Sequence, residues 1–428
     1  MKRISGMVFG LLAIAAAQAD GQPPSAATAT VLHAARMLDI ESGRITSPGE
    51  ILVQGERIAA VGSSVTHPAG ANVVDLGDTT LMPGLIDVHV HLFLHPGAED
   101  FQTVAESVAT RTIIATTAAK ADLMAGYTAE RDMGTEGAGS ADTAVRDAIN
   151  KGLIPGPRLR ISGNAIDILG GHEDANGYNP EQHVLSNATY ANSAEELVAA
   201  IRQQHKEGSD FAKLYETGRD EMRDGTLHTP YQYTVEQLKA AVVEEARLGG
   251  NVAVHAQGEP GTGFAAQAGV ASIDHATQLS EQTMRLMKEK NIPAVPTFAV
   301  FEFFMNETPE RAEREKVMLD YKIKEFQKQI AAGVPFAVGS DVGPFPHGTQ
   351  ARELVLMVKY GMKPLAALQA DLLNGARLLG WGGQIGALKA GYYADVIAVP
   401  GSPLDDIANV SHVAFVMKGG VVVRPIAH

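Results

Sequence analysis

The chain has 428 residues, of which 45% are hydrophobic and 20% charged, and its formal net charge is −14. This composition is typical of a globular protein and excludes a disordered chain, while the acidic balance argues against a nucleic-acid groove, which needs clustered Lys and Arg. Cysteine is absent, which excludes disulfides, a thiol nucleophile and a Cys-ligated zinc site. Any metal must therefore be held by histidine, carboxylate or lysine-derived groups.

Residues 1–19 have the pattern of a cleavable signal peptide. Lys2 and Arg3 precede an apolar run over residues 4–17, and Ala17-Gln18-Ala19 forms a small-x-small cleavage site. The apolar run is shorter than the roughly 20 residues that a membrane-spanning helix needs. We therefore expect cleavage after Ala19 and a secreted or periplasmic protein that no longer contacts the membrane.

Residues 20–82 and 380–428 share one pattern, in which short apolar runs alternate with turn residues about every ten positions. Residues 51–53 and 58–61 form such runs near the start, and residues 395–399 and 413–417 form them near the end. Both regions are typical of small antiparallel strands and flank one long middle region. We expect the two ends to meet in a single β-sandwich domain.

Residues 83–379 alternate β-type segments with helical patterns. The segments predicted as strands are 85–91, 127–133, 158–166, 211–215, 252–255, 272–275, 294–298 and 336–341. Helical patterns between them include residues 194–206, 234–248, 280–289 and 311–332. This alternation predicts a (β/α)₈ barrel of α/β class. An open doubly wound sheet is the alternative, but the Gly-rich loop expected after its first strand is missing.

Polar side chains stand where several of these strands end. His89 and His91 close the first strand, and His255, His275 and Asp341 close the fifth, sixth and eighth. The strand ends of a barrel converge on the face that holds the active site, so these side chains would meet there. His89 and His91 share one strand face, as a metal chelate requires, although hydrogen-bonded surface histidines have the same spacing.

Lys213 lies within the apolar segment 211–215. Such a lysine either reaches solvent at the strand end or is buried, in which case its pKa falls. A neutral amine can react with CO₂ to form a carbamate, an anionic ligand whose two oxygens can bridge two cations. His255, His275 and Asp341 each fit a structural role when taken alone, and their joint placement at strand ends is what indicates a site.

The sequence resembles the amidohydrolase superfamily of metal-dependent hydrolases. The resemblance rests on residues 83–91 (PGLIDVHVH), Lys213, His255, His275, Asp341 and residues 386–396 (GALKAGYYADV). The resemblance covers nearly the whole mature chain and implies the same barrel and sandwich. It implies two divalent metals, with Zn²⁺ favoured and Mn, Co or Fe as alternatives. It implies that His89, His91 and Asp341 bind the more buried metal, that His255 and His275 bind the second, and that carboxylated Lys213 bridges both.

Within the superfamily the chain looks similar to the imidazolonepropionase-like group with Xaa-Pro dipeptidases, and to secreted amidohydrolases that hydrolyse ochratoxin A. Residues 170–172 (GGH) and 346–348 (PHG) carry this similarity. It implies attack of a metal-bridged hydroxide on a small amide or dipeptide, with release of a C-terminal amino acid. His172 would contact the scissile carbonyl and Asp341 would shuttle the proton. His347 is expected to contact the substrate, and Tyr231 or Tyr233 to hold its carboxylate.

Two other functions stay open. A cyclic-amide hydrolase or deaminase of the same superfamily is one alternative, but many deaminases use one metal and no lysine bridge. A non-enzymatic binding scaffold is the other, although such relatives usually lose ligands. Barrels of this family often assemble, so a homo-oligomer is one of the assembly states that the sequence leaves open.

Overall fold

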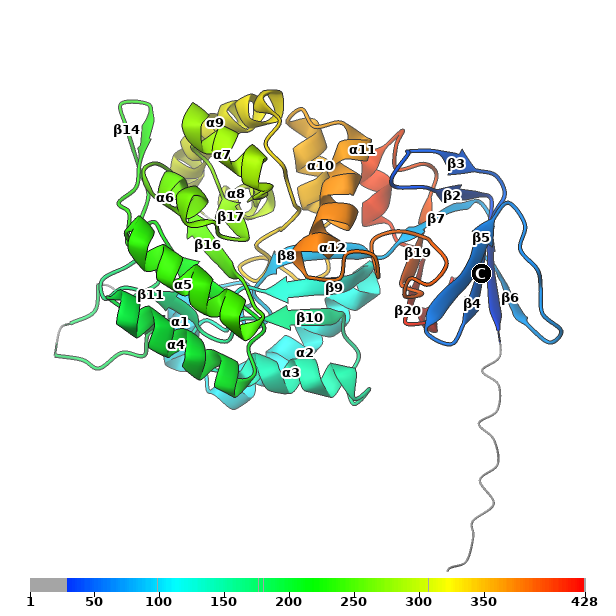
Figure 1. Cartoon of the computed structure of the whole chain (residues 1–428), viewed down its shortest axis with the longest axis horizontal. Coiled ribbons are helices and arrows are strands. Elements are labelled where there is room, and N and C mark those ends of the chain that lie inside the picture. The colour runs from blue at the N-terminus through cyan, green and yellow to red at the C-terminus, as the bar shows by residue number, and fades with distance from the viewer. Residues whose placement is uncertain (1–28, 98, 176, 180, 307, 427–428) are drawn as a thin grey trace, which may run out of the picture.

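The computed structural model describes residues 29–97, 99–175, 177–179, 181–306 and 308–426. The expected signal peptide, residues 1–19, lies outside the described residues. Two units lie side by side along the long axis, a barrel surrounded by helices and a smaller all-β unit (Figure 1). Among the described helices, none is long and apolar enough to cross a membrane.

Seven strands of the barrel run parallel in chain order. They are β8 (Leu85–Val90), β9 (Tyr127–Asp132), β10 (Arg158–Ile161), β13 (Ala212–Tyr215), β16 (Val252–Ala256), β17 (Ser272–His275) and β18 (Ala294–Val295). One sheet has the order β10-β9-β8. In the other, β13, β16, β17 and β18 follow one another, and β11 (Ala165–Asp167) pairs with β13 and with the edge strand β12 (Ala188–Tyr190). The Asp210 N–H donates to the Ile161 carbonyl and links the two sheets.

The eighth segment, residues 336–342, closes the ring without forming a regular strand. Isolated parallel bridges join Phe336 to Ala294 and Val342 to Val90. The Asp341 N–H also donates to the His89 carbonyl at 2.9 Å. Gly339 permits this approach, since a Cβ there would lie 2.6 Å from the His89 Cβ. The predicted (β/α)₈ barrel is confirmed, with an irregular last strand.

The predicted seventh strand, residues 294–298, is shorter in the structure. β18 ends at Val295, and α8 (Phe298–Phe304) begins three residues later. Thr297, just before this helix, has a left-handed φ of 54° that ends the extended backbone. The apolar sequence that predicted a strand continues into a helix whose side chains line the barrel mouth.

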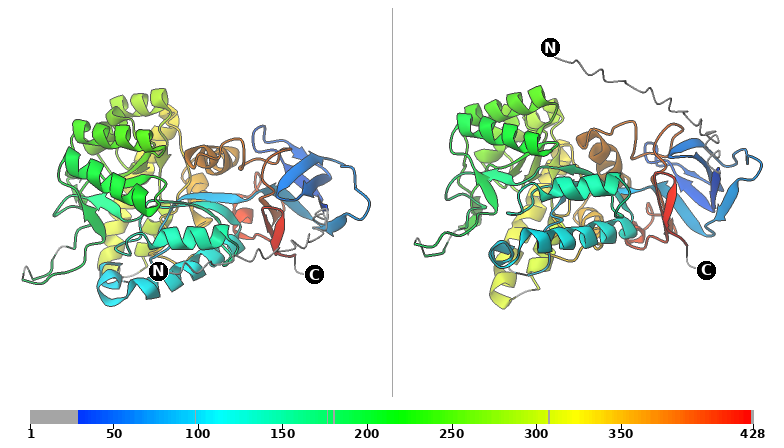
Figure 2. Two further views of the ribbon diagram at one scale, coloured as in Figure 1. Left: turned by 60° about the horizontal axis from the view of Figure 1, so that its bottom comes forward. Right: turned by 90° about the horizontal axis from the view of Figure 1, so that it is seen from below.

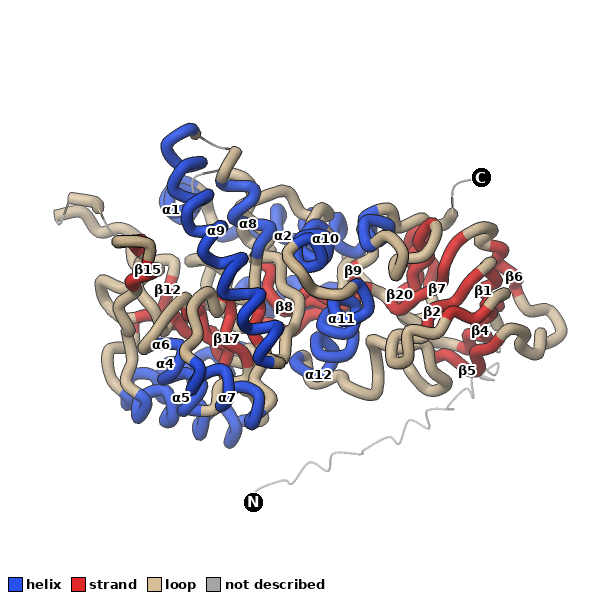
Figure 3. The backbone as a smooth tube through the Cα atoms, turned by 90° about the horizontal axis from the view of Figure 1, so that it is seen from above, coloured by secondary structure: helices blue, strands red, loops and turns tan. Residues whose placement is uncertain are grey.

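Helices cover the outside of the barrel. They are α1 (Glu99–Ala105), α2 (Val108–Ala125), α3 (Ala141–Asn150), α4 (Ala194–Glu207), α5 (Val235–Leu248), α6 (Gly261–Ala268), α7 (Glu281–Lys290), α9 (Pro309–Ala332), α10 (Arg352–Lys359), α11 (Pro364–Gln369) and α12 (Gly375–Leu378), with a π-helical turn at Ala370–Asn374. Side-chain caps explain why the sequence indicated their starts. Ser193, Thr234, Ser280 and Thr308 each accept a hydrogen bond from a first-turn N–H of α4, α5, α7 and α9. Figure 3 shows α8 and α9 beside each other.

The all-β unit contains two sheets built from both ends of the chain. Their strands are β1 (Thr30–Ala34), β2 (Arg36–Leu38), β3 (Ile45–Thr46), β4 (Gly49–Gln54), β5 (Arg57–Gly62), β6 (Asn72–Asp75), β7 (Thr79–Pro83), β19 (Val396–Pro400), β20 (Phe415–Lys418) and β21 (Val421–Arg424). One sheet has the order β5-β4-β1-β6 and the other β21-β20-β19-β7-β2-β3. Figure 2 shows the first and last strands at the same end of the molecule.

The antiparallel pair β7 and β19 joins the two ends of the chain. Met82 lies opposite Ile397 in this pair, and Leu81 lies opposite Ala398. Leu32, Ile51 and Phe415 belong to one buried cluster that gathers strands from both termini. The sandwich expected from the fold class is therefore present, whereas the exact domain limits at residues 82 and 380 stay a prediction.

Candidate metal centre at the barrel mouth

His89 and His91 meet Asp341 where β8 ends. The two Nε2 atoms are 3.3 Å apart, and each lies 3.4 Å from Asp341 Oδ1. The alternation of β8 places both imidazoles on one side of the strand, and the eighth segment supplies the carboxylate from the neighbouring position. The sequence-based expectation that these three residues lie together agrees with their placement.

Hydrogen bonds behind the two imidazoles fix their orientation. His89 Nδ1 lies 2.8 Å from Asp274 Oδ2, and Asp274 in turn accepts hydrogen bonds from Arg131 and Ser272. His91 Nδ1 lies 3.0 Å from Glu136 Oε1. Such carboxylate contacts hold the ring so that Nε2 faces the site, as in many metal-ligating histidines.

The electrostatics of this group favour a cation. Burial lowers the pKa of His89 to about 4 although Asp341 opposes this shift, so the ring is neutral at pH 7. Burial also opposes protonation of His91, but hydrogen bonds with Asp341 and Glu136 raise its pKa well above the ordinary value. The same carboxylates that favour a positive charge on His91 would also favour a metal cation at this position.

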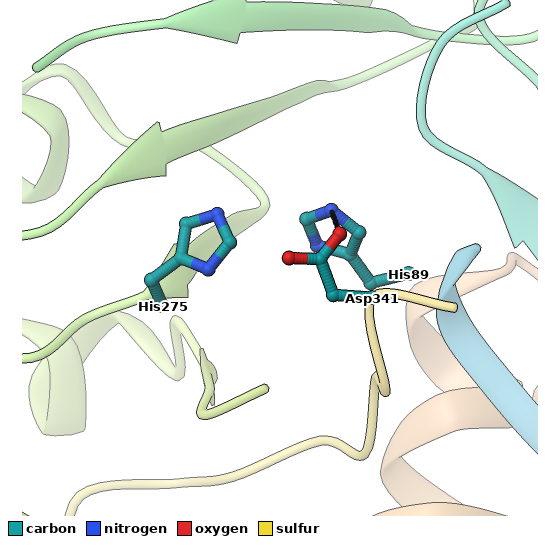
Figure 4. Close-up of side chains that lie close together, drawn as sticks. All are labelled: His89, His275 and Asp341. Atoms are coloured by element: carbon teal, nitrogen blue, oxygen red, sulfur yellow. Dashed lines mark ion pairs between the residues drawn. The ribbon is translucent and has the colours of Figure 1, made fainter. Parts of the chain in front are cut away.

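His255 and His275 bring two more imidazoles to the same place. Their ring centroids are 4.4 Å apart, and the His275 ring lies 5.2 Å from that of His89. Donor atoms of His89, His275 and Asp341 lie within 4.8 Å of one another, and Figure 4 shows these side chains facing a common space. Burial lowers the pKa of both His255 and His275 well below the ordinary value, which keeps them in the neutral, metal-binding form.

Lys213 is buried in the wall of the same cavity, with 1% of its surface exposed. Its Nζ lies 4.8 Å from the centroid of the Tyr215 ring, and within the described residues it forms no hydrogen bond or ion pair. Burial lowers its pKa, although Asp274 and Glu136 oppose the shift. This shift favours the neutral amine, the form that reacts with CO₂.

His172, from the loop after β11, completes the histidine cluster. Its ring stacks on Tyr215 at 5.2 Å and lies 4.1 Å from the His255 ring. Its backbone N–H donates to Gln232, while its buried Nδ1 has no partner among the described residues. Burial lowers the pKa of His172 to about 4, so a neutral ring faces the cavity.

The other expected substrate contacts lie elsewhere. Tyr231 is half exposed and packs edge-on against Phe264, and the buried Tyr233 hydroxyl donates to the Ala191 carbonyl. His347 Nδ1 lies 2.7 Å from Asp122 Oδ2. None of these three side chains lines the cavities around the histidine cluster, so their roles in substrate binding stay predictions without support from their positions.

Two adjoining cavities lie at the barrel mouth. The inner cavity has a volume of about 260 Å³ and contains the histidine cluster, and the outer one has about 670 Å³ and lies against α9. Residues that line both are Glu99, His172, Glu173, Asp220, Phe301 and Glu315. Sequence reasoning missed most of them, although the charged run at residues 219–221 follows a barrel strand and could have been noticed.

Backbone strain is concentrated at the same place. His275 and Asp341 have left-handed φ values of 69° and 61°, and Glu136 and Thr297, which contact the site histidines, have 49° and 54°. Non-glycine residues adopt this conformation only where the surrounding structure enforces it. The fold therefore places these side chains at an energetic cost, as functional sites often do.

The donor set fits a pair of metal ions. His255 Nε2 is buried without a hydrogen-bond partner in the described part of the chain, and the Lys213 amine is buried without a counter-ion. Unpaired buried polar groups are costly, and metal coordination together with a lysine carbamate would satisfy both. Nitrogen and oxygen donors of this kind suit Zn²⁺ and the neighbouring divalent metals.

A parallel barrel with a histidine-rich mouth and a flanking β-sandwich defines a class of barrel hydrolases. The family model described as the amidohydrolase family matches residues 80–423. The chain belongs to the amidohydrolase family, and it is a hydrolase that acts on the C–N bonds of amides.

Similar proteins support this assignment. Ochratoxinase from Aspergillus niger is 33% identical over 373 residues, which cover 79% of this chain and 75% of that protein. Its crystal structure has a TM-score of 0.80 at 29% identity, covering 93% and 96% of the two chains. A Xaa-Pro dipeptidase with bound methionine in its active site has a TM-score of 0.85 at 31% identity, covering 93% and 100%. Imidazolonepropionase from a Geobacillus species is 24% identical, covering 89% and 91%.

Proposed function

We propose that the chain is a binuclear metal-dependent amidohydrolase that releases a C-terminal amino acid from a small amide or dipeptide. The observation that carries this proposal is the buried Lys213 side chain in the same cavity wall as His255, whose Nε2 has no hydrogen-bond partner among the described residues. The similarity to ochratoxinase and to a Xaa-Pro dipeptidase also supports amide hydrolysis of this kind. The substrate named for each of those proteins lies within the proposed class.

Residues of the cluster would hold the metals in two groups. His89, His91 and Asp341, whose donor atoms lie within 3.4 Å of one another, would bind one ion. His255 and His275 would bind the other, and carboxylated Lys213 would bridge the two, with Zn²⁺ as the favoured metal. When bound, such a metal pair polarises an amide carbonyl and lowers the pKa of water.

Asp341 and His172 would carry the proton transfer and the charge stabilisation. Burial opposes ionisation of Asp341, but His89 and His91 hold its pKa well below the usual range, so it is ionised, as a proton acceptor must be. It would take the proton from the attacking water and pass it to the leaving nitrogen. His172, whose Nδ1 has no partner among the described residues, would donate to the developing oxyanion, a contact typically worth about 3 kcal/mol.

Arg219 is the cation best placed to hold the carboxylate of the substrate. It lines the outer cavity together with His172, and it forms no hydrogen bond or ion pair among the described residues. The other arginines in this wall, Arg311 and Arg314, already lie within 3.7 and 2.7 Å of Glu315. A substrate carboxylate in the outer cavity could thus form an ion pair with the guanidinium of Arg219.

The same proposal includes export from the cytoplasm. Residues 1–19 combine a basic start, an apolar run and a small-x-small site before Asp20. Cleavage after Ala19 would release the mature enzyme into the periplasm or the medium. Mass spectrometry of protein from the culture medium and from the periplasm would give the mature N-terminus.

The central test is loss of the lysine bridge. In the native protein we expect two metals per chain by elemental analysis, a ¹³CO₂-derived carbamate signal by NMR, and hydrolysis of members of a panel of dipeptides and N-acyl amino acids. Lys213→Ala should lose the carbamate signal, the second metal and activity. Lys418→Ala is the matched control, because Lys418 is also a lysine with a burial-lowered pKa but donates to the Gly156 carbonyl far from the site.

Two results would contradict the proposal. One is Lys213→Ala protein that keeps two metals and full turnover, which would remove the bridge. The other is native protein with one metal that deaminates its substrate, which would favour the deaminase alternative.

A further inference from the structure

We propose that Asp220 is a specificity-determining residue that binds a primary ammonium group of the substrate beside the scissile amide. The inference rests on the proposed amide hydrolysis and narrows its substrate class. Substrates would carry a free amine, from the α-ammonium of a dipeptide or from a basic side chain. N-acyl amino acids without an amine would be poorer substrates.

Asp220 lies at the junction of the two cavities. It follows β13 in the chain and lines both the inner cavity with the histidine cluster and the outer cavity beside α9. Its Oδ1 is buried and has no hydrogen-bond partner among the described residues. Burial raises the pKa of Asp220 to about 7, although Lys322 partly opposes the shift. A buried carboxylate without a donor is costly, and a ligand that donates would remove that cost.

The neighbouring cations do not satisfy Asp220. Lys322 Nζ donates to the His275 carbonyl at 2.8 Å and to Thr277 Oγ1 at 2.9 Å, so its hydrogen bonds go elsewhere. Arg219 lines only the outer of the two cavities. Glu315 also lines both cavities and adds negative charge near Asp220, but Glu315 has its own partner, Arg314, at 2.7 Å. Among the described residues of this wall, Asp220 is thus the carboxylate whose Oδ1 is left without a partner.

A primary ammonium fits the chemistry and the size of this space. In a dipeptide the α-ammonium is one carbon away from the scissile carbonyl, so a carbonyl at the histidine cluster keeps the ammonium within the inner cavity of about 260 Å³. An ammonium supplies three donors to carboxylate oxygens. The aromatic rings of Phe301 and Phe304 form part of the same wall and would add a favourable face for a cation. A basic side chain would reach Asp220 from the outer cavity.

The test compares substrates that differ only in the amine. Alanyl-phenylalanine and propionyl-phenylalanine test the α-ammonium, while propionyl-lysine and propionyl-norleucine test a side-chain ammonium. In the native, metal-loaded enzyme we expect kcat/KM to be roughly 10- to 100-fold higher for the amine-bearing substrate than for its partner in at least one pair. This ratio corresponds to the usual free energy of a hydrogen bond to a charged group. Asp220→Asn, which keeps shape and removes charge, should reduce that ratio to near one.

Asp224→Asn is the matched control. Asp224 lies in the turn between β14 (Glu221–Arg223) and β15 (Thr226–His228), is exposed, and lines neither cavity. This variant should keep the native ratio. Equal use of both members of each pair by the native enzyme would overturn the proposal, and so would an Asp220→Asn enzyme that keeps the preference.

A binding measurement separates this inference from the proposed hydrolysis. Calorimetry would compare ketomethylene isosteres of alanyl-phenylalanine with and without the amine, since they bind without being cleaved. Tighter binding of the amine form to the native protein, lost in Asp220→Asn, would support the role of Asp220 even if no amide in the panel were hydrolysed. Equal binding of the two isosteres, with hydrolysis intact, would remove Asp220 and leave the proposed function standing.

Discussion

The barrel mouth and the junction between barrel and sandwich both bury charged side chains, but they satisfy them differently. At the junction, Arg158 forms two contacts with Asp395, at 2.8 and 3.2 Å, and the Gly419 N–H donates to the same carboxylate at 2.7 Å. At the mouth, Lys213 and Asp220 lie in the cavity wall with no ion pair among the described residues. The same kind of group is paired in one region and unpaired in the other.

This difference separates structural from functional charge. A buried ion pair that is fully hydrogen-bonded holds two parts of a fold together, whereas an unpaired buried group is tolerated only where something else compensates it. Backbone strain at His275 and Asp341 points to the same end of the barrel. The mouth is therefore the region where substitutions should change chemistry, and the junction is the region where they should change stability.

The largest expected effect comes from Asp341→Asn. Asparagine tolerates the left-handed φ of 61° at this position, so the backbone should be kept while the proton acceptor is lost. We expect kcat to fall roughly 10²- to 10⁴-fold with an unchanged circular dichroism spectrum. Asp405→Asn, at an exposed position of the loop after β19, serves as the control. Near-normal turnover in Asp341→Asn would exclude this residue as the proton shuttle.

Much of the barrel and of the histidine cluster at its mouth could be predicted from local sequence. His89, His255, His275 and Asp341 stand at the ends of apolar segments, and the geometry of a barrel brings strand ends together whatever their separation in the chain. The eighth strand was also predicted, because residues 336–341 keep the apolar pattern even though only isolated bridges hold them. The pattern of apolar segments therefore predicted both the strands of the barrel and the polar residues at their ends.

Residues that depend on packing between elements could not be predicted in this way. Asp274 supports His89 across the barrel interior, and Asp220 reaches the mouth from a loop whose path the sequence does not define. The polar alternation of Ser272 and Asp274 in β17 is the one local signal that indicates an inward-facing carboxylate there. Tyr231 is bridged to Thr217 and lines neither cavity, so its contact with the substrate carboxylate stays a prediction.

A smaller effect is expected at the rim of the mouth, from Arg219→Gln. If Arg219 holds the carboxylate, the native enzyme should prefer alanyl-phenylalanine to its C-terminal amide, and the variant should lose roughly fivefold of that preference, mainly through KM. The effect is modest because Arg219 is exposed and solvent screens its charge. Arg223→Gln is the control, since Arg223 pairs with Glu221 and lines neither cavity. An unchanged preference in Arg219→Gln would place the carboxylate elsewhere.

The smallest effect on activity is expected at the junction, from Asp395→Asn. This change leaves Arg158 without its counter-ion, and because the Arg158 side chain is 20% exposed, we expect a loss of about 2 kcal/mol, below the 3–5 kcal/mol of a fully buried pair. Thermal unfolding should occur a few degrees lower, while kcat/KM below the transition stays within about twofold of native. A tenfold loss of activity with an unchanged melting temperature would show that the junction transmits strain to the mouth. In that case the paired charges would belong to the catalytic machinery, and the division between structural and functional charge would fail.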